Sequence, residues 1–371
     1  MDLRNKQLAK SLVHYSCRLQ KNEKILIEAK GVDGLPLVAQ IVKEVYAAGG
    51  LPFVNISSEI IDRELLLHTT EEQLNLRANV DKELMDKMQA YIGVRSGANT
   101  YELADISPEN LQLLSKLYNY PVHTNIRVAK TKWVILRYPN ASMAQLANMS
   151  QEAFSEFYYD VCNLDYGKMN KAMDPLKLLL DKTDKVHIKG PGTDLRFSIK
   201  DIPTIKCAGE CNIPDGEIYT SPVRDSVNGI ITFNTPSLHA GFTYEKVKLT
   251  FENGKVTQAQ ANDTKRLEKV LDTDNGSRFI GEFALGVNPY IKKPMMDILF
   301  DEKIMGSFHM ALGSSYKGAY NGNDSAIHWD LISIQTPEMG GGEIFFDDVL
   351  VRKDGQFMLK ELEVLNPENL K

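Results

Sequence analysis

The first half of the chain alternates short apolar segments with longer segments of helical periodicity. Residues 24–30 form an apolar strand candidate, and residues 35–48 carry apolar side chains at helical spacing. Gly49 and Gly50 end that helix, and a second strand candidate follows at residues 51–56. Strands that are separated by a helix usually pair in parallel, because the helix returns the chain to the same end of the sheet. The pattern therefore predicts a doubly wound α/β sheet in this half.

Ser107 and Pro108 mark the start of another helix in the same half. A serine side chain caps the first turn of a helix, and proline is favoured at the first helical position. The other elements expected here are a charged helical region, three strands and two further helical segments, at residues 59–89, 90–94, 122–128, 133–138, 142–165 and 174–182.

The sequence pattern changes after about residue 183, where short strands and turns replace the longer segments. The pair Asn253-Gly254 lies between two alternating runs and predicts a β-hairpin, and a second hairpin is expected around residues 353–355. A length of 371 residues fits about two domains. We therefore predict an N-terminal α/β domain at residues 1–180 and a C-terminal α+β domain, rich in short strands, at residues 181–371.

Composition and charge exclude several kinds of partner. The formal net charge of −6 gives no basic surface for nucleic acid, and no polybasic run favours an anionic membrane. Every apolar run is far shorter than the roughly 20 residues that span a bilayer, and the N-terminus has no apolar signal-peptide core. The four cysteines are scattered, which favours free thiols over disulfides. We expect a cytoplasmic protein without nucleic-acid or membrane partners.

The second half contains a set of residues that suits a metal ion. His328 and Asp330 are separated by one residue, so on a strand their side chains share one face. His309 lies in the same stretch, and Glu217 and Glu282 lie in two acidic turn motifs upstream. Two imidazoles and three carboxylates suit zinc, cobalt or manganese in a hydrolytic centre. We therefore predict a metal site in the C-terminal domain.

Each of these residues also has a plain structural interpretation. Glu217 follows a Pro-Asp-Gly turn and, taken alone, fits an exposed carboxylate. Glu282 has apolar neighbours and needs a partner, for which an arginine or lysine is as suitable as a metal. A single histidine such as His309 is more often a hydrogen-bonded core residue, and Tyr316 beside Gly318 fits a surface tyrosine. The metal hypothesis therefore depends on the convergence of several segments.

Other common catalytic motifs are missing from the sequence. There is no GxSxG nucleophile motif and no glycine-rich dinucleotide fingerprint after the first strand. The turn at residues 190–194 lacks the GK[ST] of a phosphate loop, and Cys207 and Cys211 do not have zinc-finger spacing.

Four segments resemble one known family. IPDGEIYTSP, GEFALG, HMALGSSY and SAIHWDLI occur in the order found in the M29 metallo-aminopeptidases, the aminopeptidase T, AmpS and PepS group, and the resemblance covers most of the chain. It implies a homodimeric two-metal exopeptidase that removes N-terminal residues from peptides. The connection between Tyr316 and His328 is shorter than is typical of the family, which leaves the substrate preference open. The resemblance also implies the site residues: Glu217, Glu282, His309, His328 and Asp330 as metal ligands and Tyr316 in the active site.

The expected chemistry follows from this set of ligands. Two divalent ions (zinc, cobalt, manganese or magnesium) would activate a water molecule, and either Glu282 or Asp330 would be the shared ligand. As a ligand of the ions that activate the water molecule, Glu282 is also expected to be a catalytic residue. Tyr316 would donate a hydrogen bond to the developing oxyanion. Two alternatives stay open, namely another metal-dependent amidohydrolase and a metal-stabilised peptide-binding protein without turnover. Phosphate chemistry is disfavoured because no basic residues cluster near the ligand motifs.

Overall fold

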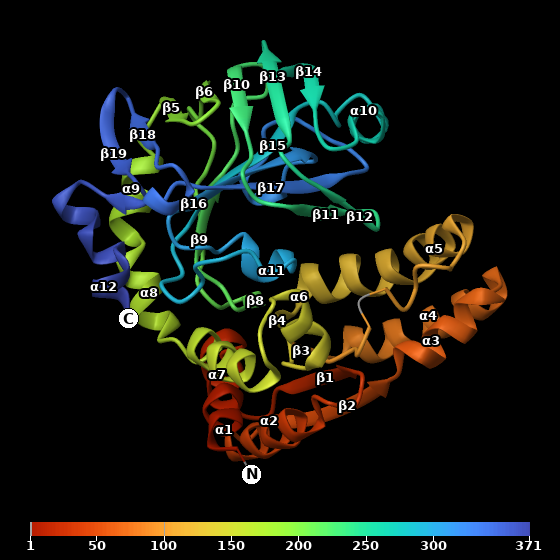
Figure 1. Cartoon of the computed structure of the whole chain (residues 1–371). Coiled ribbons are helices and arrows are strands. Elements are labelled where there is room, and N and C mark those ends of the chain that lie inside the picture. The colour runs from red at the N-terminus through yellow and green to blue at the C-terminus, as the bar shows by residue number, and fades with distance from the viewer. Residues whose placement is uncertain (1, 100) are drawn as a thin grey trace. The chain divides into compact units, whose positions relative to one another are not determined.

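The computed structural model describes residues 2–99 and 101–371, which form two compact units (Figure 1). Unit 1 contains the chain up to Asn163 together with Gly209–Pro214, and unit 2 contains Leu164–Ala208 and Asp215–Lys371. The predicted domain boundary at residue 180 lies within unit 2, at the end of helix α9 (Asp174–Leu180).

Unit 1 is built around a five-stranded parallel sheet, which confirms the predicted α/β fold. The strands β1 (Lys24–Lys30) and β3 (Ala90–Arg95) are buried because helices cover the sheet, and their sequences are correspondingly apolar. The last strand comes from a distant segment that pairs with β4 at Ile135 and Leu136. The strand order is β2 (Leu51–Ser57), β1 (Lys24–Lys30), β3 (Ala90–Arg95), β4 (Lys132–Arg137) and β8 (Asn212–Ile213).

The helices of unit 1 begin largely where the sequence indicates. Ser107 caps α5 (Pro108–Leu114), since its Oγ accepts a hydrogen bond from the backbone N–H of Asn110 at 3.2 Å. The charged region at residues 59–89 forms two helices because Thr70 caps a new one. The helical segments are α1 (Leu3–Lys10), η1 (Ser11–Ser16), α2 (Leu35–Ala47), α3 (Glu59–Leu67), α4 (Glu71–Asp86), α5 (Pro108–Leu114), η2 (Ser115–Val128), α6 (Ala141–Leu146) and α7 (Gln151–Cys162).

One predicted strand is wrong. Residues 122–128 belong to the wide helical segment η2, which also contains Pro121. Tyr118, Val122 and Ile126 are buried at a spacing of four residues, which is a helical period. This stripe packs against Tyr91 and the side chains of α4, so burial in tertiary structure outweighs the local β preference of the branched residues.

Unit 2 contains a large antiparallel sheet and a short hairpin. Both predicted hairpin turns are confirmed, with Asn253 and Gly254 at φ 50° and 83° and Asp354 and Gly355 at φ 50° and 82°. The order of the large sheet is β14 (Lys255–Gln260), β13 (Lys248–Glu252), β10 (Asn228–Thr232), β6 (Thr193–Ser198), β5 (Lys185–Gly190), β18 (Glu343–Phe346), β19 (Val349–Lys353) and β20 (Gln356–Phe357), and the hairpin is β11 (Ser237–His239) with β12 (Phe242–Tyr244).

A second antiparallel sheet in unit 2 carries the predicted metal ligands. Its inner strands β15 (Ile280–Gly286) and β16 (Ser307–Gly313) are buried along their whole length. The order is β17 (His328–Ile334), β16 (Ser307–Gly313), β15 (Ile280–Gly286), β9 (Glu217–Thr220) and β7 (Ile205–Cys207). The helical segments of the unit are α8 (Tyr166–Ala172), α9, α10 (Thr264–Leu271), α11 (Ile298–Asp301), η3 (Lys317–Ala319), η4 (Pro337–Met339), η5 (Lys360–Leu365) and α12 (Pro367–Leu370).

No helix among residues 2–99 and 101–371 is both long and apolar enough to cross a membrane.

Candidate metal centre

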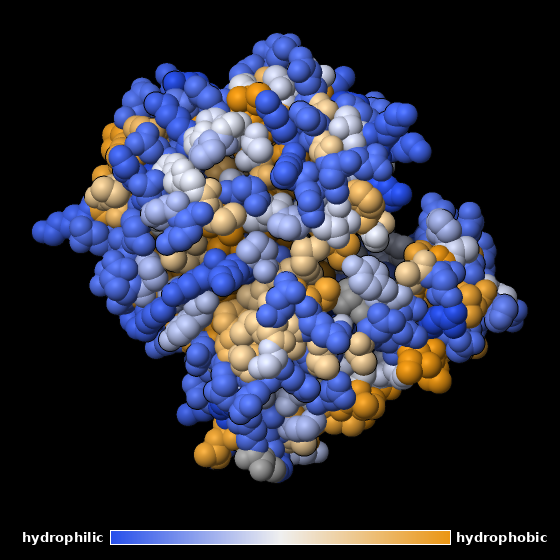
Figure 2. Space-filling model, in the orientation of Figure 1, coloured by the Kyte–Doolittle hydropathy of each residue, from blue (hydrophilic) through white to orange (hydrophobic). Residues whose placement is uncertain are grey.

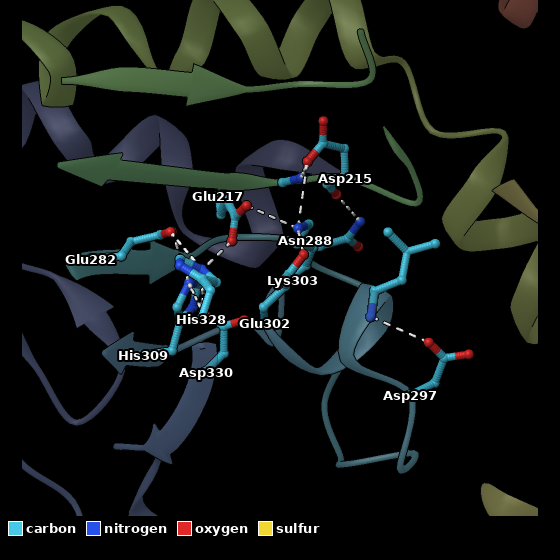
Figure 3. Close-up of polar contacts among 12 residues, drawn as sticks. Asp215, Glu217, Glu282, Asn288, Asp297, Glu302, Lys303, His309, His328 and Asp330 are labelled. Atoms are coloured by element: carbon cyan, nitrogen blue, oxygen red, sulfur yellow. Dashed lines mark hydrogen bonds and ion pairs between the residues drawn. The ribbon is translucent and has the colours of Figure 1, made fainter. Parts of the chain in front are cut away.

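The structure brings all five predicted ligands together on one face of the second sheet (Figure 3). His309 Nε2 lies 3.3 Å from Glu282 Oε1 and 3.5 Å from Glu217 Oε2. His328 Nε2 lies 3.3 Å from Glu282 Oε2 and 3.4 Å from Asp330 Oδ1. Four strands that are distant in the sequence therefore supply one compact group of donor atoms.

The strand register explains this convergence. Glu282, Ala311 and Asp330 form one row across β15, β16 and β17, so the side chain between the two carboxylates is small. His309 lies two residues before Ala311 and shares its face. A β-bulge between Ile280 and Glu282 shifts the pairing at this point.

The donor atoms fall into two groups, each compact enough to hold one ion. Glu282, His328 and Asp330 form the first group, and Glu217, Glu302 and His309 form the second. Within each group the donor atoms lie within 4.8 Å of one another. A third combination, Cys207 with Asp215 and Glu217, satisfies the same limit.

Buried atoms without hydrogen-bond partners indicate that this face suits cations. Glu217 Oε2 and Glu282 Oε2 are both buried and make no hydrogen bond of good geometry with the described residues, although a histidine Nε2 lies 3.5 Å and 3.3 Å away, respectively. An unsatisfied buried acceptor is costly, and a divalent cation would satisfy carboxylate oxygens and imidazole nitrogens. His328 Nδ1 lies 2.7 Å from the carbonyl oxygen of Ser314, which can only accept, so Nδ1 carries a proton. This hydrogen bond orients the ring with Nε2 toward the carboxylates.

Charge interactions change the proton affinity of the cluster. Burial opposes the charged form of both histidines, but the surrounding carboxylates outweigh it and raise the pKa of His309 to about 9 and that of His328 to about 11. Burial also opposes ionisation of Asp330, yet the two imidazoles lower its pKa to about 2. Burial also opposes ionisation of Glu282, but its interactions with the same two histidines lower its pKa. Without a cation, both imidazoles are therefore protonated at neutral pH.

Comparison with known proteins identifies the family. The family model described as thermophilic metalloprotease (M29) matches residues 2–357. The chain belongs to the M29 family. The resemblance of the four sequence segments is thereby confirmed, as is the prediction of a metal-dependent peptidase.

Two curated relatives match over most of this M29 chain, and a third matches over a shorter part. AmpS, an aminopeptidase of Bacillus subtilis, is 24% identical over 364 residues, which cover 87% of each chain. PepS, an aminopeptidase of Streptococcus thermophilus, is 24% identical and covers 85% of this chain and 84% of its own. Aminopeptidase T of Thermus thermophilus is 32% identical over 154 residues, which are 38% of this chain and 37% of the relative.

Two solved structures share the fold. Wild-type AmpT from Thermus thermophilus has a TM-score of 0.80 at 20% identity and covers 96% of this chain and 99% of its own. The 2,5-dihydroxypyridine dioxygenase from Pseudomonas putida KT2440 has a TM-score of 0.62 at 12% identity, with 96% and 98% covered. Because the same fold occurs in a dioxygenase, the side chains at the site must decide the chemistry.

Tyr316 lies next to the predicted ligands in this M29 protein. Its ring centroid is 4.5 Å from that of His328 and 5.8 Å from that of Tyr219. Tyr316 as a whole residue is half exposed. Burial of the hydroxyl end and the nearby carboxylates raise the pKa of Tyr316 above its usual value, so the phenol keeps its proton at neutral pH. Arg224, which follows Glu217 by seven residues, stacks on Phe279 at 3.7 Å and pairs with Asp225.

Two residues of the cluster were missed by the sequence analysis. Glu302 is a member of the second donor group, and burial raises the pKa of its carboxyl to about 8. Lys303 is fully buried and pairs with both Glu217 and Glu302. Burial disfavours its charge, but these carboxylates raise the pKa of Lys303 well above the ordinary value. The sequence Asp301-Glu302-Lys303 looks like a solvated charged turn, and only its apolar neighbours Phe300 and Ile304 hint at burial.

Proposed function

We propose that this chain is a metal-dependent aminopeptidase that removes N-terminal residues from peptides and uses two divalent ions. Membership of the M29 family and relatives named aminopeptidase support the reaction. The observation that carries the site is the convergence of Glu217, Glu282, His309, His328 and Asp330 on one buried sheet face. Zinc, cobalt, manganese and magnesium all suit such donors, and the two histidines favour the first three.

The two donor groups define the proposed positions of the ions. Glu282, His328 and Asp330 would hold one ion, and Glu217, His309 and Glu302 would hold the other. Glu282 is the better shared ligand, because Oε1 faces His309 and Oε2 faces His328. Asp330 faces both histidines through Oδ1 alone, at 3.4 Å and 4.0 Å.

The side chains around the ions would do the remaining work of peptide hydrolysis. Bound divalent ions supply Lewis acidity and lower the pKa of water to near neutrality. Tyr316 holds its proton and would donate a hydrogen bond to the oxygen that becomes negative in the transition state. Ser314 fixes the tautomer of His328, so the ring needs no reorientation when it binds a cation.

Assays with defined metal content test this function. The metal-stripped protein is reloaded with zinc, cobalt or manganese and assayed with aminoacyl-anilides, N-acetylated aminoacyl-anilides and simple amides. An aminopeptidase should cleave only the substrates with a free α-amine. Cleavage of acetylated substrates or simple amides would favour another amidohydrolase, and peptide binding without cleavage under every metal would favour a binding protein.

Cation binding should release protons at neutral pH. His309 and His328 have pKa values of about 9 and 11 in the absence of a cation, so both hold a proton at pH 7. A cation that binds Nε2 must displace that proton, so affinity should rise about tenfold per pH unit for each displaced proton. Affinity therefore falls as the pH is lowered, and the contribution of His309 ends above about pH 9.

Isothermal titration calorimetry measures this release when zinc is added in buffers of different ionisation enthalpy. About three protons should be released at pH 7 when both sites fill, one each from His309, His328 and Glu302. The His328→Ala variant is the matched comparison and should release one fewer. A proton count near zero for the unmodified protein would contradict the proposed ligands.

We also propose that the chain forms a homodimer through the edge of the parallel sheet in unit 1. Strand β2 ends that sheet, and none of its residues is buried. Such an edge offers unpaired backbone groups to a second copy, and a two-fold axis would make the contact self-complementary. Figure 2 shows hydrophobic surface in this region, to which β2 and α3 contribute Phe53, Val54, Ile56, Ile60 and Ile61. The cytoplasmic location expected from the sequence stays a prediction.

Light scattering after size exclusion tests the dimer. The unmodified protein should have a molar mass twice that of one chain. Ile56→Lys should have the mass of a monomer, because it places a charge in the apolar contact. Leu178→Lys on α9 is the control, since Leu178 is 60% exposed and Ile56 is 54% exposed. A monomeric unmodified chain, or a dimer that survives Ile56→Lys, would show that β2 is not the interface.

A further inference from the structure

Lys303 lies inside the proposed metal centre although lysine is not a metal ligand there. It lies two residues after the end of α11, and its side chain is fully buried. Its Nζ lies 2.9 Å from Glu217 Oε1, donates to Glu302 Oε1 and lies 4.0 Å from Asp215 Oδ1 (Figure 3). One ammonium therefore neutralises part of the charge of three carboxylates in unit 2.

The ammonium shares its partners with only one of the two donor groups. Glu217 and Glu302 are both carboxylates of the Glu217–Glu302–His309 group. Glu217 directs one oxygen to Lys303, and its other oxygen lies 3.5 Å from His309 Nε2. Within the described residues, no ion pair of 4.0 Å or less joins Lys303 to Glu282 or Asp330. The two proposed ion positions are therefore electrostatically different.

We propose that Lys303 is a positioning residue that makes the two ion positions unequal. Its ammonium holds Glu217 and Glu302 in place when no cation is bound, and it weakens cation binding at the Glu217–Glu302–His309 position. This inference rests on the proposed two-ion function. The Glu282–His328–Asp330 position is the tighter one, and it fills first.

The sign of the effect follows from linkage. Buried carboxylates without a countercharge are costly, so Lys303 stabilises the metal-free protein. Once a cation occupies the second position, the carboxylates are already neutralised and the ammonium and the cation repel each other at close range. A group that stabilises the empty state more than the loaded state lowers the affinity for the cation. Replacement of Lys303 by a neutral residue should therefore tighten the second ion.

The main comparison that tests this assignment uses the unmodified chain, Lys303→Met, Lys303→Arg and Lys206→Met. Methionine keeps the length of the side chain and removes the charge, and arginine keeps the charge. Lys206 is the control, because it is also a mostly buried lysine of unit 2 and pairs with Asp174 rather than with the proposed ligands. Zinc affinity is measured by competition with a chelator of known affinity, and Lys303→Met is purified with zinc so that a less stable metal-free form does not prevent the measurement.

The unmodified chain should bind two zinc ions with unequal affinities. Lys303→Met should bind the weaker ion about 10- to 100-fold more tightly and leave the stronger ion unchanged. Its melting temperature should also rise more on addition of zinc than that of the unmodified chain. Lys303→Arg and Lys206→Met should resemble the unmodified chain. In a His328→Ala background, which weakens the first position, Lys303→Met should still tighten the remaining ion.

Distinct results would overturn the inference. If the unmodified chain binds two ions and Lys303→Met leaves the second affinity unchanged or weakens it, the role of Lys303 is wrong while the two-ion function stands. If Lys206→Met changes the affinity for the weaker zinc ion as much as Lys303→Met does, any loss of positive charge in unit 2 has this effect. The specific role of Lys303 is then also wrong. Fewer than two ions in the unmodified chain would overturn the two-ion function, and this inference with it.

Discussion

Glu282→Gln should abolish the hydrolysis of leucyl-anilide and leave the fold intact. Glu282 is 3% exposed, and each of its two oxygens faces a different histidine. Glutamine has the same shape, but it lacks the negative charge and replaces one oxygen with an N–H donor group. If the shared ligand contributes about 4 kcal/mol to transition-state stabilisation, its loss lowers the rate about a thousandfold.

Metal content and folding must be measured beside activity for this variant. Glu282→Gln should retain its circular dichroism spectrum and lose at least one bound ion per chain. Glu361→Gln is the control, because Glu361 is exposed and lies in η5. Full activity with two bound ions in Glu282→Gln would show that Glu282 is not a ligand.

The convergence of the ligands was predictable only in part from the sequence. Alternation along a strand places His328 and Asp330 on one face, and β17 has this geometry. That rule does not show that Glu282 lies in the same row as Asp330, because the row depends on the pairing of β15, β16 and β17. The resemblance to the M29 family supplied this long-range information.

Features that depend on tertiary burial escaped prediction. Glu302 and Lys303 are adjacent charged residues, which usually face solvent. Lys303 is nevertheless 0% exposed, because Glu217 on β9 supplies its countercharge. Strand β8 is only two residues long, and its place in the sheet depends on β4. The sequence around Lys303 does not indicate that Glu217 is its partner, and the sequence around β8 does not indicate that it pairs with β4.

The fold alone would not have settled the reaction. A dioxygenase with a TM-score of 0.62 shares the architecture across nearly the whole chain. In this chain, small residues such as Ala284 and Ala311 lie between the carboxylates and imidazoles on the second antiparallel sheet of unit 2. The chemistry therefore depends on which residues occupy a few inward positions of β9, β15, β16 and β17.

Tyr316→Phe should separate transition-state stabilisation from metal binding. The variant keeps the ring that contacts His328 at 4.5 Å and removes only the hydroxyl. Removal of one donor to an oxyanion typically lowers kcat by about 10²- to 10³-fold. We expect a loss of this size with KM and metal content nearly unchanged, in contrast to Glu282→Gln.

The pH profile and a second tyrosine complete the test. The raised pKa of Tyr316 means that its ionisation should not reduce activity on the alkaline side up to about pH 10, the ordinary tyrosine pKa. Tyr320→Phe is the matched control, because Tyr320 is exposed, follows Tyr316 by four residues and donates to Asp324 at 2.7 Å. If Tyr316→Phe keeps its kcat, or if Tyr320→Phe loses as much, the phenol of Tyr316 does not stabilise the transition state and the oxyanion must be bound by the ions and backbone groups alone.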